Sequence, residues 1–144
     1  MHKNQGSIYY GDYLHLNSLL STQKPLSQKY ANENDGECHD ETLFIIVHQV
    51  YELWFKQILH ELNDIINIFT QDFVPENQLS VVIHRLDRIK KIQSLLISQL
   101  DVMETMTPMD FLEFRDLLIP ASGFQSVQFR EIEIKLGLST NDRL

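Results

Sequence analysis

The 144-residue sequence contains a single cysteine, Cys38, so no disulfide can form within the chain and a metal site built from several cysteines is excluded. Glycine and proline are scarce, at five and four residues, and a hydrophobic fraction of 43% argues against wholesale disorder. Lysine and arginine together number 12 against 20 acidic residues, which gives a formal net charge of -8. This balance argues against binding to nucleic acid or to an anionic membrane, because both depend on clustered positive charge.

Long apolar runs are missing as well. The longest run around position 48 is LFIIV, far shorter than the roughly 20 residues that cross a bilayer. The N-terminal stretch MHKNQGSIYYGDY carries no apolar segment of the kind found in a signal peptide. These absences predict a cytoplasmic protein that has no membrane partner.

What the sequence does contain is helical periodicity. A first long helix is predicted to begin with Asp40 as its N-cap and to end near Pro75. A second is predicted from about Asn77 to Glu104, antiparallel to the first because the connection is short. Shorter helices are predicted near residues 10–20, after Thr107 as N-cap, and from 124 to a C-cap at Gly137. The predicted fold is all-α: a helical bundle of two long antiparallel helices plus shorter helices, forming a single unit over residues 1–144.

His48 lies in the first third of the first predicted long helix, within HDETLFIIVHQVYELWFKQILHEL. It shares an apolar face with Phe44 at helical spacing. Spacing alone favours a core histidine with a satisfied hydrogen bond over a histidine that belongs to a site. No residue is predicted to ligate a metal, since none of the six histidines follows a glutamate by three residues, as in di-iron bundles.

Arg115 lies one turn after Phe111 in the segment FLEFRDLL. Local chemistry favours a surface arginine paired with Glu113 or Asp116. Taken with the first long helix, however, the sequence offers two aromatic rings, an imidazole and a guanidinium. Such a set suits a ligand with a flat ring and a carboxylate, because a guanidinium binds a carboxylate through two parallel hydrogen bonds.

Four blocks carry a resemblance to a known family: YGDYLHLNSLLSTQKPLS, HDETLFIIVHQVYELWFKQILHEL, METMTPMDFLEFRDLL and PASGFQSVQFREIEIKLG. In this order they resemble tryptophan 2,3-dioxygenases, haem enzymes that use O₂ to open the indole ring of L-tryptophan and give N-formyl-L-kynurenine. The resemblance implies a b-type haem, ferrous when it binds O₂, and an intertwined homotetramer.

Carried over residue by residue, the resemblance makes His48 the distal histidine that hydrogen-bonds the substrate indole N–H. Arg115 matches the arginine that binds the substrate carboxylate, and Ser122 with Gly123 matches a loop that closes over substrate and haem. The implied substrate-binding residues are Phe44, Ile45, Ile46, Val47, His48, Phe111, Arg115, Ser122 and Gly123, and a neighbouring subunit contributes Tyr10, Tyr13 and Leu14.

One departure from the family concerns length. Its members are considerably longer, and the histidine that ligates the haem iron lies in a C-terminal half that this sequence lacks. The chain is therefore expected to be the N-terminal half of a longer haem dioxygenase domain, unable alone to bind haem natively or to turn over tryptophan. The alternative is a non-catalytic helical module that associates with itself through exposed apolar faces.

Overall fold

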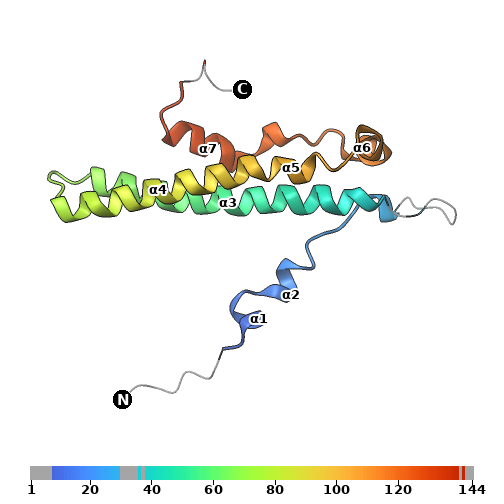
Figure 1. Cartoon of the computed structure of the whole chain (residues 1–144), viewed down its shortest axis with the longest axis horizontal. Helices are drawn as coiled ribbons and strands as arrows, with labels where there is room; N and C mark the ends of the chain where they lie inside the picture. The colour runs from blue at the N-terminus through green and yellow to red at the C-terminus, as the bar shows by residue number, and fades with distance from the viewer. Residues whose placement is uncertain (1–7, 30–35, 37, 140, 142–144) are drawn as a thin grey trace.

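The computed structural model describes residues 8–29, 36, 38–139 and 141, and within these residues it contains helices and no strand. Two long helices, α3 (His39–Phe69) and α4 (Glu76–Ser98), run antiparallel along the length of the molecule (Figure 1). The all-α fold and the pair of long antiparallel helices are thus confirmed. No helix among the described residues is long and apolar enough to cross a membrane.

The shorter elements cover one side and one end of this pair. The helix α7 (Val127–Lys135) lies along α3, and α6 (Pro108–Arg115) sits at the end of the bundle where α3 begins (Figure 1). The remaining short elements are α1 (Tyr10–Tyr13), α2 (Leu16–Leu19), η1 (Ser27–Lys29), α5 (Leu100–Met103), η2 (Asp116–Leu118) and η3 (Gly123–Gln125).

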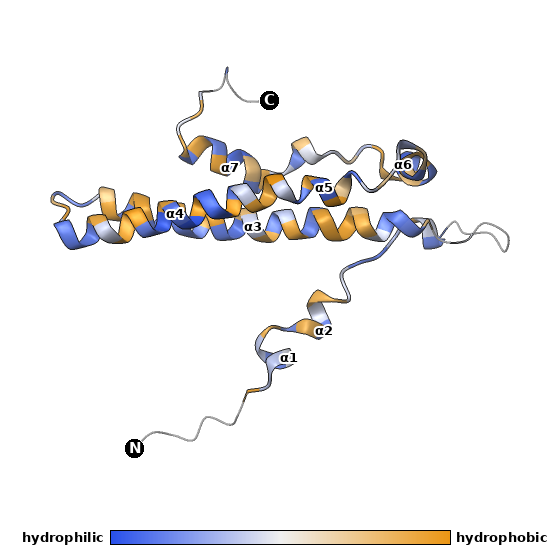
Figure 2. Cartoon of the chain, in the orientation of Figure 1, coloured by the Kyte–Doolittle hydropathy of each residue, from blue (hydrophilic) through white to orange (hydrophobic). Residues whose placement is uncertain are grey.

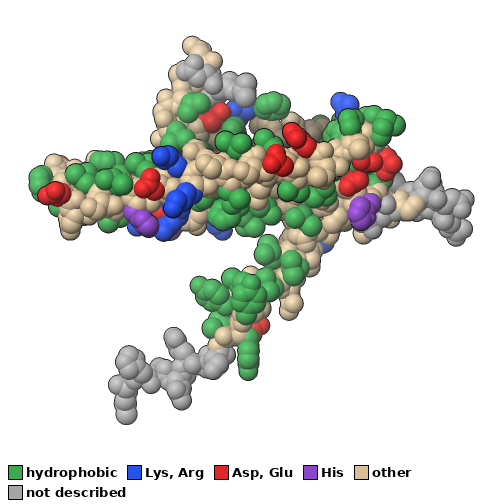
Figure 3. Space-filling model, in the orientation of Figure 1, with side chains coloured by type: hydrophobic (Ala, Val, Ile, Leu, Met, Phe, Trp, Pro, Cys, Tyr) green, Lys and Arg blue, Asp and Glu red, His purple; other side chains and the backbone are tan. Residues whose placement is uncertain are grey.

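An N-terminal arm, residues 8–29, leaves the bundle near the start of α3 (Figure 1). It carries α1 and α2, which pack on each other. Figure 3 shows hydrophobic side chains gathered along this arm, away from the bundle. The arm therefore contributes none of its large apolar side chains to the core.

The hydrophobic core lies between α3, α4 and α7. Its buried members recur at spacings of three and four residues, which place them on one face of each long helix. They are Ile58, Leu59, Leu62 and Ile65 of α3, Val82, Ile89, Ile92 and Leu96 of α4, and Ile132 of α7. Figure 2 shows that apolar residues continue along α3 beyond this core, toward its N-terminal end.

Charged side chains also join the helices. The carboxylate of Glu61, which is fully buried, accepts hydrogen bonds from Arg88 at 2.6 Å and from Arg85 at 3.1 Å, and Arg85 also pairs with Asp64. Burial raises the pKa of Glu61, but hydrogen bonds from Arg88, Gln57 and Arg85 and the Arg88 charge outweigh it and hold the pKa below its usual value. The buried carboxylate therefore stays ionised between its cationic partners.

The helix predicted near residues 10–20 is divided into α1 and α2, and the boundaries of the three longest helices differ from the sequence prediction at one place each. The helix α3 begins at His39, with Cys38 rather than Asp40 at the N-cap. The second predicted long helix is divided at Gln99 into α4 and α5. There the Val102 N–H donates to the Gln99 carbonyl, a bond to the third residue back that tightens the chain.

The third difference concerns the last helix, which begins after Ser126 rather than at residue 124, because the Ser126 hydroxyl caps the Phe129 N–H. The predicted stop at Gly137 is confirmed. Its φ of 83° lies in the left-handed region, and Leu138 N–H donates to the Glu133 carbonyl in the arrangement that commonly ends a helix.

Candidate functional site

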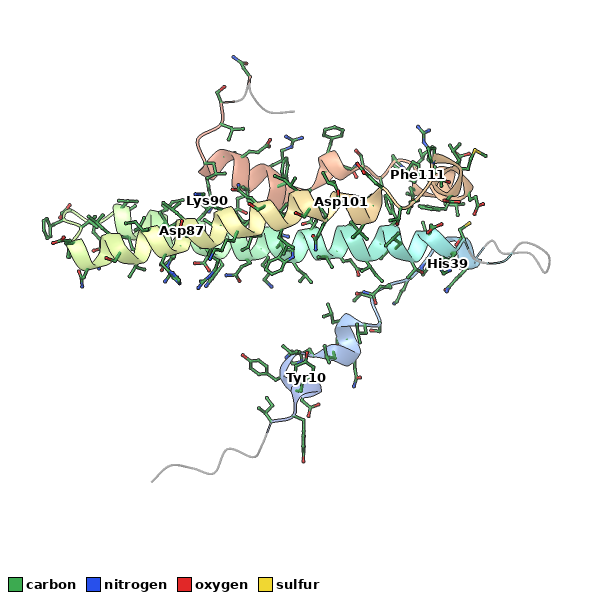
Figure 4. All side chains as sticks on the ribbon, in the orientation of Figure 1. Tyr10, His39, Asp87, Lys90, Asp101 and Phe111 are labelled. Carbon is green, nitrogen blue, oxygen red and sulfur yellow. The ribbon has the colours of Figure 1, made fainter. Side chains whose placement is uncertain are left out.

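Three phenylalanines from α3 and α6 form an aromatic cluster at one end of the bundle. Ring centroids are 5.7 Å apart for Phe44 and Phe111, 5.6 Å for Phe44 and Phe114, and 5.5 Å for Phe111 and Phe114. The Phe114 ring is fully buried and lies edge-on to both partners, a favourable arrangement for aromatic rings. Figure 4 places Phe111 near the N-terminal end of α3. The cluster thus links two elements that are far apart in the sequence.

The imidazole of His48 lies against this cluster. Its ring centroid is 4.1 Å from that of Phe44, and its Nδ1 is 2.8 Å from the Phe44 carbonyl oxygen. A carbonyl can only accept, so Nδ1 carries the hydrogen and the neutral ring keeps Nε2 as an acceptor. The side chain is exposed. The prediction of a core histidine is therefore wrong about burial, because the described part of the chain leaves His48 exposed beside the cluster, and right about a satisfied hydrogen bond.

Arg115 is the last residue of α6, and its side chain is exposed. Among the residues that the structure describes, its guanidinium forms no ion pair, so the predicted alternative of a pairing with Glu113 or Asp116 is wrong. Phe111 lies one turn earlier on the same helix, so the two residues project from the same side of α6. A cation with five unused donors is available for an anionic partner.

A capping box fixes the start of α6. The Thr107 hydroxyl accepts from the Asp110 N–H at 3.3 Å, and the Asp110 carboxylate accepts from the Thr107 N–H at 2.8 Å. These hydrogen bonds with Thr107 lower the pKa of Asp110. The N-cap predicted at Thr107 is confirmed, and it sets the direction in which α6 presents Phe111 and Arg115.

The predicted segment 44–48 is divided between faces of α3. Ile46 lies two residues, or about 200° of helical rotation, from Phe44. Ile46 and Val47 line a hollow of about 180 Å³ between α3 and α5, and Ile46 also lines an open hollow of about 440 Å³ with His39. Neither hollow is lined by the aromatic cluster. The substrate-binding roles of Ile45, Ile46 and Val47 stay predictions.

The predicted closing loop lies between α6 and α7. Ser122 accepts from the Phe124 N–H at 3.3 Å and donates its own N–H to Gln125 Oε1 at 3.1 Å, which caps η3. Both Ser122 and Gly123 are exposed. Within the described residues no hydrogen bond or ring contact joins them to the aromatic cluster or to His48. Their role over a substrate stays a prediction.

Tyr10, Tyr13 and Leu14 lie on the N-terminal arm, where 75%, 68% and 40% of their surfaces are exposed. The arm points away from the bundle, so these residues do not reach the aromatic cluster of their own chain (Figure 1). Their contribution to a neighbouring subunit stays a prediction.

Sequence reasoning missed two residues. Phe114 follows Phe111 by three positions on α6, and that spacing was the signal for a second ring on the same face. The other is Glu41 in the first turn of α3, whose carboxylate is buried against the backbone of Leu26 and Ser27. No local pattern in the sequence reveals that contact.

The residues present fit one face of a flat group. Phe44, Phe111 and the His48 imidazole provide an apolar wall with one polar edge, which suits a conjugated ring system. Among the residues that the structure describes, no group of three or more histidine, cysteine, aspartate or glutamate side chains is placed to hold a metal ion. The arrangement can therefore orient an aromatic ligand and anchor an anionic group on it.

Comparison with known proteins identifies the family. A sequence model described as tryptophan 2,3-dioxygenase matches residues 1–144. The chain belongs to the tryptophan 2,3-dioxygenase family. The resemblance carried by the four sequence blocks is thus confirmed.

Individual members of the tryptophan 2,3-dioxygenase family match over nearly the whole chain. The protein of that name from Alteromonas mediterranea is 57% identical over 144 residues, which is 100% of this chain and 39% of the relative. The Bdellovibrio bacteriovorus enzyme is 56% identical over 137 residues, covering 95% of the chain and 37% of the relative. The Dictyostelium discoideum protein is 52% identical over 140 residues, which is 97% of this chain and 34% of the relative. The chain therefore spans only 34–39% of the length of these relatives.

Proposed function

We propose that this chain forms the substrate-facing part of an enzyme that inserts both atoms of O₂ into the indole ring of L-tryptophan and releases N-formyl-L-kynurenine. The observation that carries the proposal is the aromatic cluster, against which the His48 imidazole lies. One turn after Phe111 on α6, Arg115 is exposed and forms no ion pair among the described residues. Membership of the family supports it.

His48 orients the indole. The hydrogen bond from its Nδ1–H to the Phe44 carbonyl leaves Nε2 as an acceptor, and an indole N–H is a donor without acceptor capacity. This match fixes which edge of the substrate ring turns toward α3. A protonated imidazole has no acceptor, so the same contact requires the neutral ring. His48 thus acts by positioning the substrate at its nitrogen.

Arg115 and the phenylalanines hold the remainder of the substrate. The guanidinium binds the tryptophan carboxylate through two parallel hydrogen bonds, which set both the distance and the plane of that group. Phe44 and Phe111 stack against the indole ring and exclude water from one of its faces. Ser122 and Gly123 close over the substrate from the loop before α7.

The cofactor of the proposed reaction is a b-type haem, which supplies the iron that activates O₂ when it is bound. Phe44, Phe111 and His48 would form the apolar wall on the substrate side of that group. Tyr10, Tyr13 and Leu14 complete the site of a neighbouring copy within a homotetramer. The proposal also includes a cytoplasmic location.

A chimaera tests the proposal: residues 1–144 replace the matching segment of the Alteromonas mediterranea relative. We expect a Soret band and tryptophan-dependent formation of N-formylkynurenine. Arg115→Ala should weaken tryptophan binding by about 2–5 kcal/mol, because in the complete, substrate-bound enzyme the carboxylate loses a partner that the closed site shields from water, with unchanged helical content. Lys90→Ala, which removes an exposed cation from α4, is the matched control. A folded, haem-loaded chimaera without activity would contradict the proposal.

The isolated 144-residue chain provides a second arm of the same test. It is expected to form no N-formylkynurenine, since it spans only 34–39% of the length of the relatives. A native Soret band together with turnover by the isolated chain would show that expectation to be wrong.

A second candidate function is self-association without catalysis. It is favoured by large apolar side chains exposed along α4, among them Ile83 at 61% and Ile97 at 69%. Under this alternative, sedimentation would reveal stable oligomers of the isolated chain, and Arg115→Ala would leave every measured property of the chimaera unchanged.

A further inference from the structure

The buried carboxylate of Glu41 lies outside the aromatic cluster and holds the arm root, which we define as residues 22–29. Only 1% of the Glu41 surface is exposed. Its Oε1 accepts the Leu26 N–H at 2.6 Å, and its Oε2 accepts the Ser27 N–H at 2.9 Å. Two successive backbone N–H groups that converge on one carboxylate form a small anion-binding nest. Hydrogen bonds to an ionised carboxylate are stronger than those between neutral groups.

Further hydrogen bonds fasten the same root to α3 and to the residue before it. The Ser27 hydroxyl, itself in a residue only 4% exposed, accepts the Cys38 N–H at 3.1 Å. Two turns after Glu41 on α3, Gln49 accepts from the Gln23 side chain at 2.5 Å and donates to the Thr22 carbonyl at 3.3 Å. The arm root is therefore attached along about two turns of the helix and to the residue before it.

Beyond this root the arm has no such support. Among the described residues, the hydrogen bonds that join the arm to the bundle all start from the root. The helices α1 and α2 have four residues each, too few to be stable in isolation, and their large apolar side chains point to solvent (Figure 3). The direction of the arm is thus determined where it is attached.

We propose that Glu41 is a positioning residue: by binding the Leu26 and Ser27 N–H groups, it fixes the direction in which the N-terminal arm leaves the bundle. Its consequence rests on the proposed function, in which Tyr10 and Tyr13 of one copy complete the site of another. Glu41 of one copy then affects the substrate site of the neighbouring copy, because it fixes the arm that carries Tyr10 and Tyr13.

Trypsin cleavage of the full 144-residue chain, followed by mass spectrometry, tests this role. Cleavage after the exposed Lys29 reports opening of the root, and cleavage after Lys91 within α4 reports global unfolding. Glu41→Gln should raise the rate of cleavage after Lys29 about tenfold, which is the factor expected for the loss of a charge-assisted hydrogen bond. The rate of cleavage after Lys91 should stay unchanged. Amide hydrogen exchange at Leu26 and Ser27, measured by NMR, should accelerate by a similar factor.

Asp40→Asn is the matched control, because it removes the same charge from the same first turn of α3. The Asp40 side chain makes no hydrogen bond or ion pair in the described part of the chain, so cleavage after Lys29 should stay within twofold of the wild type. If both variants accelerated cleavage after Lys29 equally, the proposal would be overturned, because the acceleration would then reflect only the loss of charge at the N-terminus of α3. Equal acceleration at Lys29 and Lys91 would overturn it as well.

Should Glu41→Gln fail to fold, Ser27→Ala keeps the test available. It removes the acceptor of the Cys38 N–H from the same root and should raise cleavage after Lys29 severalfold, and no change there would count against the proposal. None of these measurements depends on tryptophan or haem. A chimaera without dioxygenase activity would therefore refute the proposed function while leaving the cleavage result intact.

Discussion

The two halves of α3 are similarly apolar, yet the buried hydrophobic side chains of this helix all lie in its C-terminal half. In the C-terminal half, Ile58 is 2% and Leu62 4% exposed, because α4 and α7 cover them. In the N-terminal half, Ile46 is 42% and Leu53 51% exposed, and the short elements α5 and α6 leave gaps over this part. The half that its own chain leaves open is also the half that carries His48. Apolar surface that is not used for the fold is available for binding.

The largest expected effect is a difference in the free energy of unfolding between substitutions in the two halves of α3. Ile58→Ala should lower the free energy of unfolding by about 3 kcal/mol, because it removes buried methyl groups and leaves a cavity. Ile46→Ala removes the same atoms from a half-exposed site and should cost about 1 kcal/mol or less. Urea unfolding followed by circular dichroism measures both. Equal losses would mean that Ile46 is buried in solution and that the two halves do not differ.

The next effect concerns the ion pairs beside the buried half. Glu61→Gln should lower the free energy of unfolding by about 2 kcal/mol at neutral pH, since Arg88 and Arg85 lose the charge that they pair with. The cost stays below that of a fully buried pair because the arginine side chains are 43% and 27% exposed and can turn to water. Glu131→Gln, which removes a surface partner of Lys135, should cost less than about 0.5 kcal/mol.

The same carboxylate predicts a pH dependence. The pKa of Glu61 is lowered in the folded state, so the folded protein holds the proton less tightly than the unfolded chain does. Its stabilising contribution is therefore complete above the ordinary carboxyl pKa and is lost as the pH falls through the lowered value. Between neutral and acidic pH, the free energy of unfolding should fall less steeply with pH in Glu61→Gln than in the wild type. Equal pH dependence of the two free energies would contradict this prediction.

Much of the fold could be predicted from the sequence because it depends on local patterns. The apolar period of three and four residues indicates α3 and α4, the Thr107 cap and Gly137 mark ends of helices, and all of these are confirmed. The division at Gln99 could not be predicted, because it arises from one tightened hydrogen bond and leaves no gap in the apolar pattern.

The candidate site was only partly accessible to the same reasoning. Helical spacing pairs Phe44 with His48 and Phe111 with Arg115, and the structure brings Phe44 and Phe111 together. Spacing cannot show which face of a helix lacks a neighbour, so it favoured burial for an imidazole that is exposed. The contact of Glu41 with the arm root joins residues that are 14 and 15 positions apart in the sequence, which local periodicity does not encode.

A smaller effect is expected at the boundary between the halves of α3. The Tyr51 hydroxyl donates to the Leu96 carbonyl at 2.6 Å, and Tyr51→Phe should lower the free energy of unfolding by about 1 kcal/mol. Burial raises the pKa of Tyr51, so its contribution is present at neutral pH and is lost as the pH rises through the raised value. Tyr13→Phe, on the exposed arm, should change neither the stability nor its alkaline pH dependence.

The smallest effect is expected one turn earlier, at His48. Its imidazole is exposed, and the loss of its ring contact with Phe44 in His48→Ala is offset in part by the higher helix propensity of alanine. The free energy of unfolding should therefore change by no more than about 0.5 kcal/mol, while the chimaera loses the acceptor for the indole N–H and binds tryptophan more weakly. Urea unfolding of His48→Ala beside Tyr51→Phe compares two aromatic side chains three residues apart. If His48→Ala proved the more destabilising, the imidazole would belong to the core, and the open half of α3 would have no polar group reserved for a ligand.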